Sequence, residues 1–92
     1  MRISLSKNAA KFLNELPDKD KNKIREKVRS LVYSIEQYGN IPFKELHIKT
    51  LEGVWRGCLR MRIGKIRIIF KIDRVNRELI VYGVDFRGNV YK

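Results

Sequence analysis

Basic side chains recur between residues 56 and 71, and no acidic residue interrupts them. The pair Gly64-Lys65 predicts a two-residue hairpin loop, which would place Ile63 opposite Ile66 and Arg62 opposite Arg67. Side chains alternate between the two faces of a strand, so one face of this hairpin would be cationic. Its expected members are Arg56, Arg60, Arg62, Arg67 and Lys71. Like charges directly opposite each other cost stability, so this face is expected to meet phosphate groups rather than plain solvent.

The other face of the same hairpin is apolar. The predicted register places Leu59 opposite Phe70 and Cys58 opposite Lys71. The side chains expected on this face are Leu59, Met61, Ile63, Ile66, Ile68, Phe70 and Ile72. The hairpin is therefore expected to have a core on one side and an anion site on the other.

The composition agrees with an anionic partner. The chain has 92 residues with 21 Lys and Arg against 10 Asp and Glu, which gives a formal charge of +11. A polyanion or an acidic protein should be attracted to it, and charge alone does not choose between them. The length predicts one small domain over residues 1–92, whose core can bury only a modest share of the surface.

The single cysteine, Cys58, excludes an internal disulfide and a cysteine zinc site, and it is expected to be an ordinary strand residue. No apolar run approaches the roughly 18 residues of a membrane span, so no membrane partner is expected. Without a signal peptide, the sequence predicts a cytoplasmic protein.

The elements that must position the cations follow an α+β order. A strand is expected at residues 2–5, followed by a helix that Ser6 caps and Pro17 stops. Asp18 or Asp20 would cap a second helix that ends near Gly39. Apolar residues recur at helical spacing in both, at Ala9, Phe12, Leu13 and Leu16 and then at Ile24, Val28, Leu31, Val32 and Ile35. The two helices are expected to form a hairpin.

A loop over residues 40–53 should lead to strands at 54–63, 66–73 and 79–86, with a turn at 74–77. The predicted fold is a strand and a helix hairpin packed on a twisted, mainly antiparallel sheet, in the order β-α-α-β-β-β. The helices would cover one face and leave the cationic face open as a shallow groove. Arg87 and Tyr91, at the end of the last strand, are expected at its rim.

Three phrases resemble RelE/ParE-type toxins. Cys58-Leu-Arg-Met-Arg-Ile-Gly-Lys-Ile-Arg-Ile-Ile-Phe70 is similar to the "Arg-x-Arg-(aliphatic)-Gly-x-(aromatic)-Arg" signature of that family, although Ile66 replaces the aromatic residue. Phe86-Arg-Gly-Asn-Val-Tyr91 resembles its C-terminal "Arg-x-x-x-Tyr" phrase, and Lys49-Thr-Leu-Glu-Gly53 its approach to the second strand. The resemblance covers nearly the whole chain and is strongest for the RelE branch, including archaeal members.

The resemblance implies a type II toxin, a ribosome-dependent endoribonuclease that cuts messenger RNA in the decoding site. Such cleavage needs no metal or cofactor, because the 2′-hydroxyl of the RNA attacks the adjacent phosphate. Arginines stay ionised and grip two phosphate oxygens, so they suit transition-state stabilisation. The expected catalytic residues are Arg67, Arg87, Arg62 and Tyr91, and the expected RNA-binding residues are Lys49, Arg60, Arg56 and Lys71.

The proton acceptor is the weakest part of this interpretation. Many relatives carry a histidine or a second basic residue before the C-terminal arginine, where this chain has Asp85-Phe86. The only histidine, His47, is expected in a loop before the sheet and without a role in the site. Glu52 is a further candidate base, but it is expected to be solvated. Lys49 is also a candidate acid or base. A site without a strong base would depend on the ribosome to set the geometry of the RNA.

The implied partner is an acidic, RelB-like antitoxin, and operator DNA would be bound only by the toxin–antitoxin complex. Tyr33, Tyr38 or Phe43 could be footholds for the antitoxin, but each is expected to lie in the core. Two alternatives remain. One is a ParE-like toxin that inhibits DNA gyrase without catalysis, and the other is a basic module that binds nucleic acid by charge alone.

Overall fold

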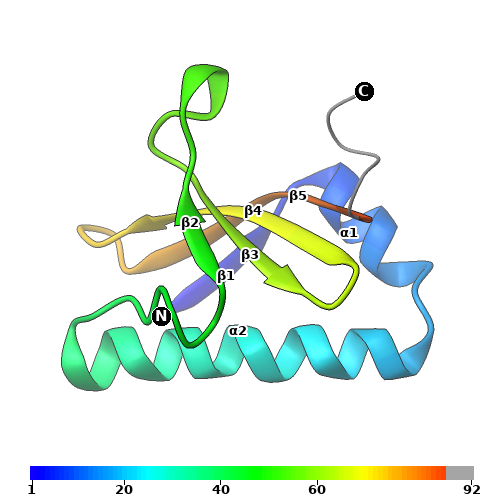
Figure 1. Cartoon of the computed structure of the whole chain (residues 1–92), viewed down its shortest axis with the longest axis horizontal. Helices are drawn as coiled ribbons and strands as arrows, with labels where there is room; N and C mark the ends of the chain where they lie inside the picture. Colours follow the sequence, from blue (N-terminus) through cyan, green and yellow to red (C-terminus); the bar gives the residue numbers. More distant parts are fainter. Residues whose placement is uncertain (87–92) are drawn as a thin grey trace.

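The architecture is a five-stranded sheet with two helices. The computed structural model describes residues 1–86, of which 85 and 86 are described by their backbone alone. The strands lie in the order β1-β5-β4-β3-β2, with β1 parallel to β5 and every other pair antiparallel. Figure 1 shows α2 running along one side of the sheet and α1 near the end of β5. The elements are β1 Arg2–Leu5, α1 Lys7–Asn14, α2 Asp18–Tyr38, β2 Ile48–Thr50, β3 Leu59–Ile63, β4 Ile66–Asp73 and β5 Glu78–Phe86. The predicted α+β class is confirmed.

The helix ends follow local chemistry, with one correction. The Ser6 hydroxyl accepts a hydrogen bond from the Ala9 amide at 3.1 Å, which is the predicted cap of α1. Gly39, at φ 71°, ends α2 in the left-handed conformation that glycine adopts without strain. The predicted aspartate cap of α2 is wrong, because Pro17 occupies the N-cap and Asp18 and Asp20 lie in the first turn. Their carboxylates still favour the helix there by opposing its dipole.

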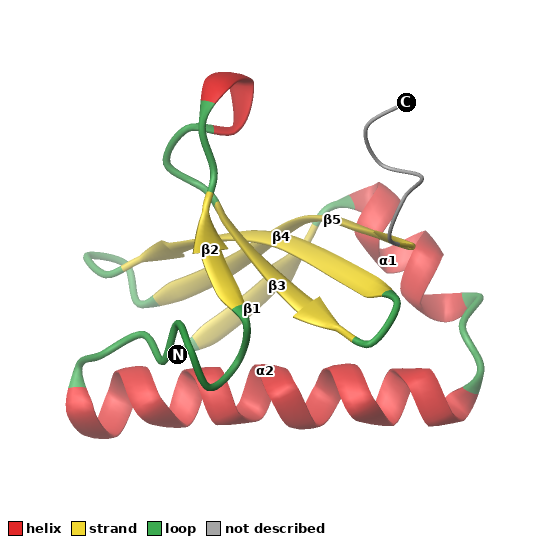
Figure 2. Cartoon of the chain, in the orientation of Figure 1, coloured by secondary structure: helices red, strands yellow, loops and turns green. Residues whose placement is uncertain are grey.

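The predicted strand over residues 54–63 is wrong in its first half. Residues Gly53–Trp55 form a single 3₁₀ turn, and β3 begins only at Leu59. Gly53 and Gly57 have φ of 67° and 92°, which a continuing strand could not contain. Residues 51–58 therefore form a loop that leaves the sheet on the side away from α2, where Figure 2 shows the 3₁₀ turn as the red tip. The loop over residues 51–58 joins β2 to β3, and β2 is a short strand in a segment that was predicted to be a loop.

The hairpin between β3 and β4 has the predicted register. Ile63 pairs with Ile66, Arg62 with Arg67, and Leu59 with Phe70. The predicted pairing of Cys58 with Lys71 is wrong, since Cys58 precedes β3. The predicted apolar face is also confirmed, because its members are buried or pack against the core together with Leu31 and Ile35 of α2.

Phe70 anchors that core. Its side chain is 1% exposed and lies on the face of β4 that contacts the helices. We expect Phe70→Ala to lower the free energy of unfolding by about 3 to 5 kcal/mol, since the lost contacts leave a cavity in a small core. Urea denaturation measures this change. Val75→Ala is the matched control, because Val75 is 91% exposed in the β4–β5 turn and its change should stay within about 0.5 kcal/mol. A loss below about 1 kcal/mol for Phe70→Ala would contradict this packing.

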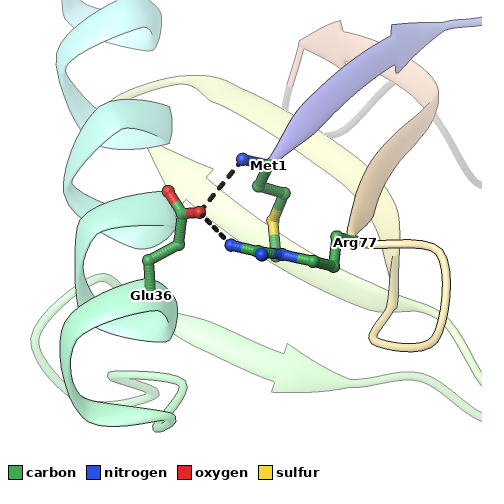
Figure 3. Close-up of polar contacts among 3 residues, drawn as sticks. All are labelled: Met1, Glu36 and Arg77. Carbon is green, nitrogen blue, oxygen red and sulfur yellow. Dashed lines mark hydrogen bonds and ion pairs between the residues drawn. The ribbon is translucent and has the colours of Figure 1, made fainter.

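Glu36 joins three parts of the chain. Its Oε2 accepts hydrogen bonds from the amino group of Met1 and from Arg77, each at 3.0 Å (Figure 3). The bond from the Met1 amino group is the main cause that holds the pKa of Glu36 below its usual value, and the bond from Arg77 is the second cause. This contact holds α2 beside the start of β1 and the β4–β5 turn.

This contact should make stability depend on pH. Because the pKa of Glu36 is lower in the folded chain, its carboxylate stabilises the fold above its usual pKa, and this contribution is lost as the pH falls through the folded value. We therefore expect Glu36→Gln to flatten the acid side of a plot of unfolding free energy against pH. Glu26→Gln, at an exposed position of the same helix, should leave the slope unchanged. Equal slopes for the wild type and Glu36→Gln would contradict the prediction.

No helix in the described part of the chain has both the length and the apolar character needed to cross a membrane.

Candidate nucleic-acid interface

Four basic residues form paired rungs on the face of the sheet opposite the core. Lys49 of β2 pairs with Arg60 of β3, and Arg62 of β3 pairs with Arg67 of β4. Directly opposite residues have Cα atoms about 4.5 to 5.5 Å apart and point to the same face. We call this set, Lys49, Arg60, Arg62 and Arg67, the cationic ladder.

The middle of the cationic ladder is largely buried, so the expectation of an open, shallow groove on this face is wrong there. Arg67 is only 8% exposed, and Ile69, which pairs with Arg60 on the same face, is 4% exposed. Arg60 and Arg62 are half-buried. The central position of β4, between β3 and β5, explains why the middle of this face is covered most. A guanidinium held in such a place is partly desolvated, which strengthens its interaction with a charged ligand.

Of the expected members of the cationic face, one lies off the sheet and one lies on that face but beyond the ladder. Arg56 is exposed in the loop that leaves the sheet, so it is not a strand residue. Lys71 alternates with Ile69 along β4 and so keeps the predicted face, but it is exposed, and it lies past the first residue of β3 and pairs with Ile80 of β5. Glu52 is exposed in the same loop as Arg56. Arg87 and Tyr91 lie outside the described residues, so their expected place at the rim stays a prediction.

A pocket opens beside the ladder, at the outer edge of the sheet. Its volume is about 360 Å³, and we call it the β2–β3 pocket. The residues that line it are Phe43, Lys44, His47, Ile48, Lys49, Arg60 and Arg62. No carboxylate is among them, so the pocket should attract an anion.

The turn over residues 43–47 builds one wall of this pocket. The Ile48 amide donates to the Phe43 carbonyl at 2.7 Å, and the Leu46 amide donates to the Pro42 carbonyl at 3.1 Å. The Arg62 amide donates to the His47 carbonyl at 3.2 Å, which ties the turn to β3. His47 has a φ of 54°, a conformation that is uncommon for residues other than glycine. These contacts fix the turn before any ligand binds.

His47 lies in a turn that precedes β2, which agrees with the loop expected from sequence, but this turn is beside basic residues. His47 lines the β2–β3 pocket together with Lys49, Arg60 and Arg62. The sequence contained a signal for this placement, because His47 and Lys49 flank the buried Ile48 with the alternation of a strand. A strand of three residues is too short for that alternation to be persuasive.

Arg60 has a buried hydrogen-bond donor that is unsatisfied within the described residues. Its Nε is buried and has no hydrogen-bond partner among the described residues. A buried donor without a partner costs about 1 to 3 kcal/mol, and a phosphate oxygen would remove that cost. The described residues include no group of three or more His, Cys, Asp or Glu side chains that could hold a metal ion.

Exposed aromatic rings lie on α2 and beside the β2–β3 pocket. Tyr33, Tyr38 and Phe43 are 58%, 68% and 43% exposed, so the expectation that each lies in the core is wrong. The rings of Tyr33 and Tyr38 touch edge to face on α2, with centroids 6.2 Å apart. A second pocket of about 370 Å³ lies between the helices and the β1 edge, lined by Leu5, Leu13, Ile24 and Val28, with Lys21 and Arg25 also lining it. Both surfaces could contact a protein.

Comparison with solved structures identifies the fold. A chain of the archaeal RelE–RelB complex from Pyrococcus horikoshii OT3 superposes with a TM-score of 0.72, at 23% identity over 97% of each chain. The isolated RelE toxin of E. coli gives 0.70, at 13% identity over 98% of this chain and 87% of that one. The YoeB/ParE toxin from Agrobacterium tumefaciens gives 0.68, at 18% identity over 95% and 99%. No protein-family model matches the sequence, and no curated protein matches it significantly.

Proposed function

We propose that this chain, which has the fold of the RelE-type toxins, is the toxin of a type II toxin–antitoxin pair and cleaves messenger RNA on the ribosome. The observation that carries the proposal is the Arg62–Arg67 rung, with the β2–β3 pocket beside it. Two guanidinium groups held side by side on rigid strands suit a phosphate that gains negative charge during reaction. The likeness to the E. coli and Pyrococcus RelE structures supports the same reading.

The chemistry requires one bond to form and one to break at the same phosphorus. The 2′-oxygen of the RNA attacks the adjacent phosphate, and the bond from phosphorus to the 5′-oxygen breaks, leaving a cyclic phosphate. Arg62 and Arg67 would hold the phosphate and stabilise its added charge. Lys49 and Arg60 would position the flanking backbone. Arg87 and Tyr91, proposed from the sequence, would complete the site.

Two protons must also move. His47 is the pocket residue best suited to accept the proton of the 2′-hydroxyl, because imidazole is an effective base near neutral pH. The leaving 5′-oxygen must gain a proton, and Lys49, which also lines the pocket, is the candidate donor. No metal or cofactor takes part in this scheme.

An acidic, RelB-like antitoxin is the proposed protein partner. The formal charge of +11 favours it, and the Pyrococcus neighbour was solved as a RelE–RelB complex. The exposed tyrosines of α2 and the apolar pocket beside β1 offer places for its apolar side chains. Operator DNA would be contacted only through that complex.

A ParE-like gyrase inhibitor is the second candidate, because the Agrobacterium neighbour is described as YoeB/ParE and its TM-score is close to those of the RelE structures. Inhibition of gyrase needs surface complementarity and no bond-breaking chemistry. The desolvated arginine rung and the histidine beside it have a use in RNA cleavage that a purely binding protein lacks.

The test is to induce the chain in cells and to map the 5′ ends of messages on translating ribosomes. New ends in phase with codons, absent from the Arg67→Ala, Arg87→Ala double variant, are the expected result. Intact messages together with loss of gyrase supercoiling activity would overturn the proposal in favour of the second candidate. Intact messages with active gyrase would leave a nucleic-acid-binding module.

A further inference from the structure

We propose that the β2–β3 pocket binds a single nucleotide of single-stranded RNA, with its base stacked on Phe43 and its phosphate held by Arg60 and Lys49. The proposal rests on the proposed function for the choice of RNA as ligand. It adds a subsite to the cleavage centre at Arg62 and Arg67, and it assigns Phe43 a role in choosing the nucleotide.

Phe43 presents a partly exposed aromatic ring outside the hydrophobic core. Its side chain is 43% exposed, and it is absent from the hydrophobic core. Its carbonyl accepts the 2.7 Å hydrogen bond from Ile48, and its amide donates to the Ile41 carbonyl at 2.9 Å. Both backbone groups of Phe43 are thus fixed, so little entropy would be lost when a base stacks on the ring. Proteins read unpaired RNA bases largely by such stacking.

The cations supply the second half of nucleotide recognition. Arg60 and Lys49 are directly paired across β2 and β3, and both line the pocket with Phe43. The Nε of Arg60 has no hydrogen-bond partner among the described residues. Lys49 is exposed on the edge strand β2. Aromatic stacking beside a cationic track is the usual combination in sites for single-stranded nucleic acid.

The size and place of the pocket agree with one nucleotide. A volume of about 360 Å³ lies at the lower end of the range for small-ligand sites. Arg62 belongs both to this pocket and to the Arg62–Arg67 rung, so a nucleotide bound here would adjoin the scissile phosphate. The base on Phe43 would then be a neighbour of the cut.

The experiment measures binding without cleavage or ribosomes. The ligand is a hexanucleotide whose 2′-oxygens are methylated, which prevents attack on the phosphate, and affinity is measured at low salt. We expect Phe43→Ala to weaken binding by about 5- to 150-fold, the loss typical for one stacked base. Phe43→Trp should keep the affinity. Val75→Ala, which removes a 91% exposed apolar side chain in the β4–β5 turn, is the control and should bind as the wild type does.

A second ligand isolates the stacked base. A set of hexanucleotides is made, each with one abasic position at a different place along the strand. One of them should bind the wild type more weakly than the intact RNA does. For that RNA, Phe43→Ala should cause no further loss of affinity. Equal affinity of the wild type and Phe43→Ala for the intact RNA would overturn the proposal. So would an acidic peptide that binds with the same dependence on Phe43, since that result would identify a protein site.

The outcome separates this proposal from the proposed function. RNA binding that depends on Phe43, with messages left intact in cells, would keep the subsite and refute the enzyme. Cleaved messages with no effect of Phe43→Ala on binding would keep the enzyme and refute the subsite.

Discussion

Arg67→Lys is expected to lower the rate of message cleavage by about 100- to 1,000-fold although the positive charge is kept. Lysine offers a compact ammonium group, whereas arginine presents a planar fork that holds two phosphate oxygens at once. Arg67 is 8% exposed and pairs with Arg62 across the hairpin. A lysine at this buried position has little room to move, so its ammonium group cannot restore both contacts to the phosphate. Single-turnover cleavage of a ribosome-bound message measures the effect.

Two controls give the Arg67 result its meaning. Arg29→Lys makes the same chemical change at an exposed position of α2, on the other side of the sheet, and should leave the rate unchanged. Thermal unfolding of Arg67→Lys should show a folded protein, so the lost rate is not lost structure. Retention of more than about half of the wild-type rate would show that charge alone suffices, as it would for a module bound by counterion release.

The sequence could predict the two-faced hairpin because its signals are local. Gly64-Lys65 sets a two-residue loop, and a two-residue loop sets the register of both strands. A slip by one residue would have put Arg62 and Arg67 into the core and Ile63 and Ile66 into solvent. The start of α1 and the end of α2 could also be predicted from the sequence, because Ser6 and Gly39 end these helices through contacts with neighbouring residues.

The edge of the sheet could not be predicted in the same way. The strand β2 has only three residues, and its pairing with β3 depends on a loop that Gly53 and Gly57 turn back. The burial of Arg67 comes from its place on a central strand, which is a property of the whole sheet. The shift between Ile69 and Phe70 in the pairing of β4 with β5 places Tyr82 as the extra residue, next to Gly83, and a glycine inside a strand is only a general signal of such a bulge.

These two classes of feature meet at the candidate site. The Arg62–Arg67 rung is local and was expected, whereas the β2–β3 pocket needs the long-range pairing of β2. The pairing brings Lys49 beside Arg60, and it brings His47 against Arg62. The position of His47 beside Arg62 could not be read from the sequence, because it depends on the strand β2, which was not predicted.

His47→Asn should reveal whether that histidine is the proton acceptor. We expect a loss of cleavage rate of about 100- to 10,000-fold, the usual contribution of a positioned acid or base. Asparagine is the appropriate replacement because it tolerates the left-handed conformation, at φ 54°, that His47 occupies. It is polar and neutral, so the charge of the surrounding Lys44, Lys49, Arg60 and Arg62 is left as it is.

Chemical rescue distinguishes proton transfer from simple packing, because free imidazole can replace a missing base but cannot replace a missing packing contact. His47→Gly, which also suits φ 54°, should regain activity when imidazole is added in solution, whereas His47→Asn should not. A His47→Asn enzyme within about threefold of the wild-type rate would assign the proton to the ribosome or the RNA. The cations would then be the whole of this chain's catalytic contribution, acting through electrostatics and position alone.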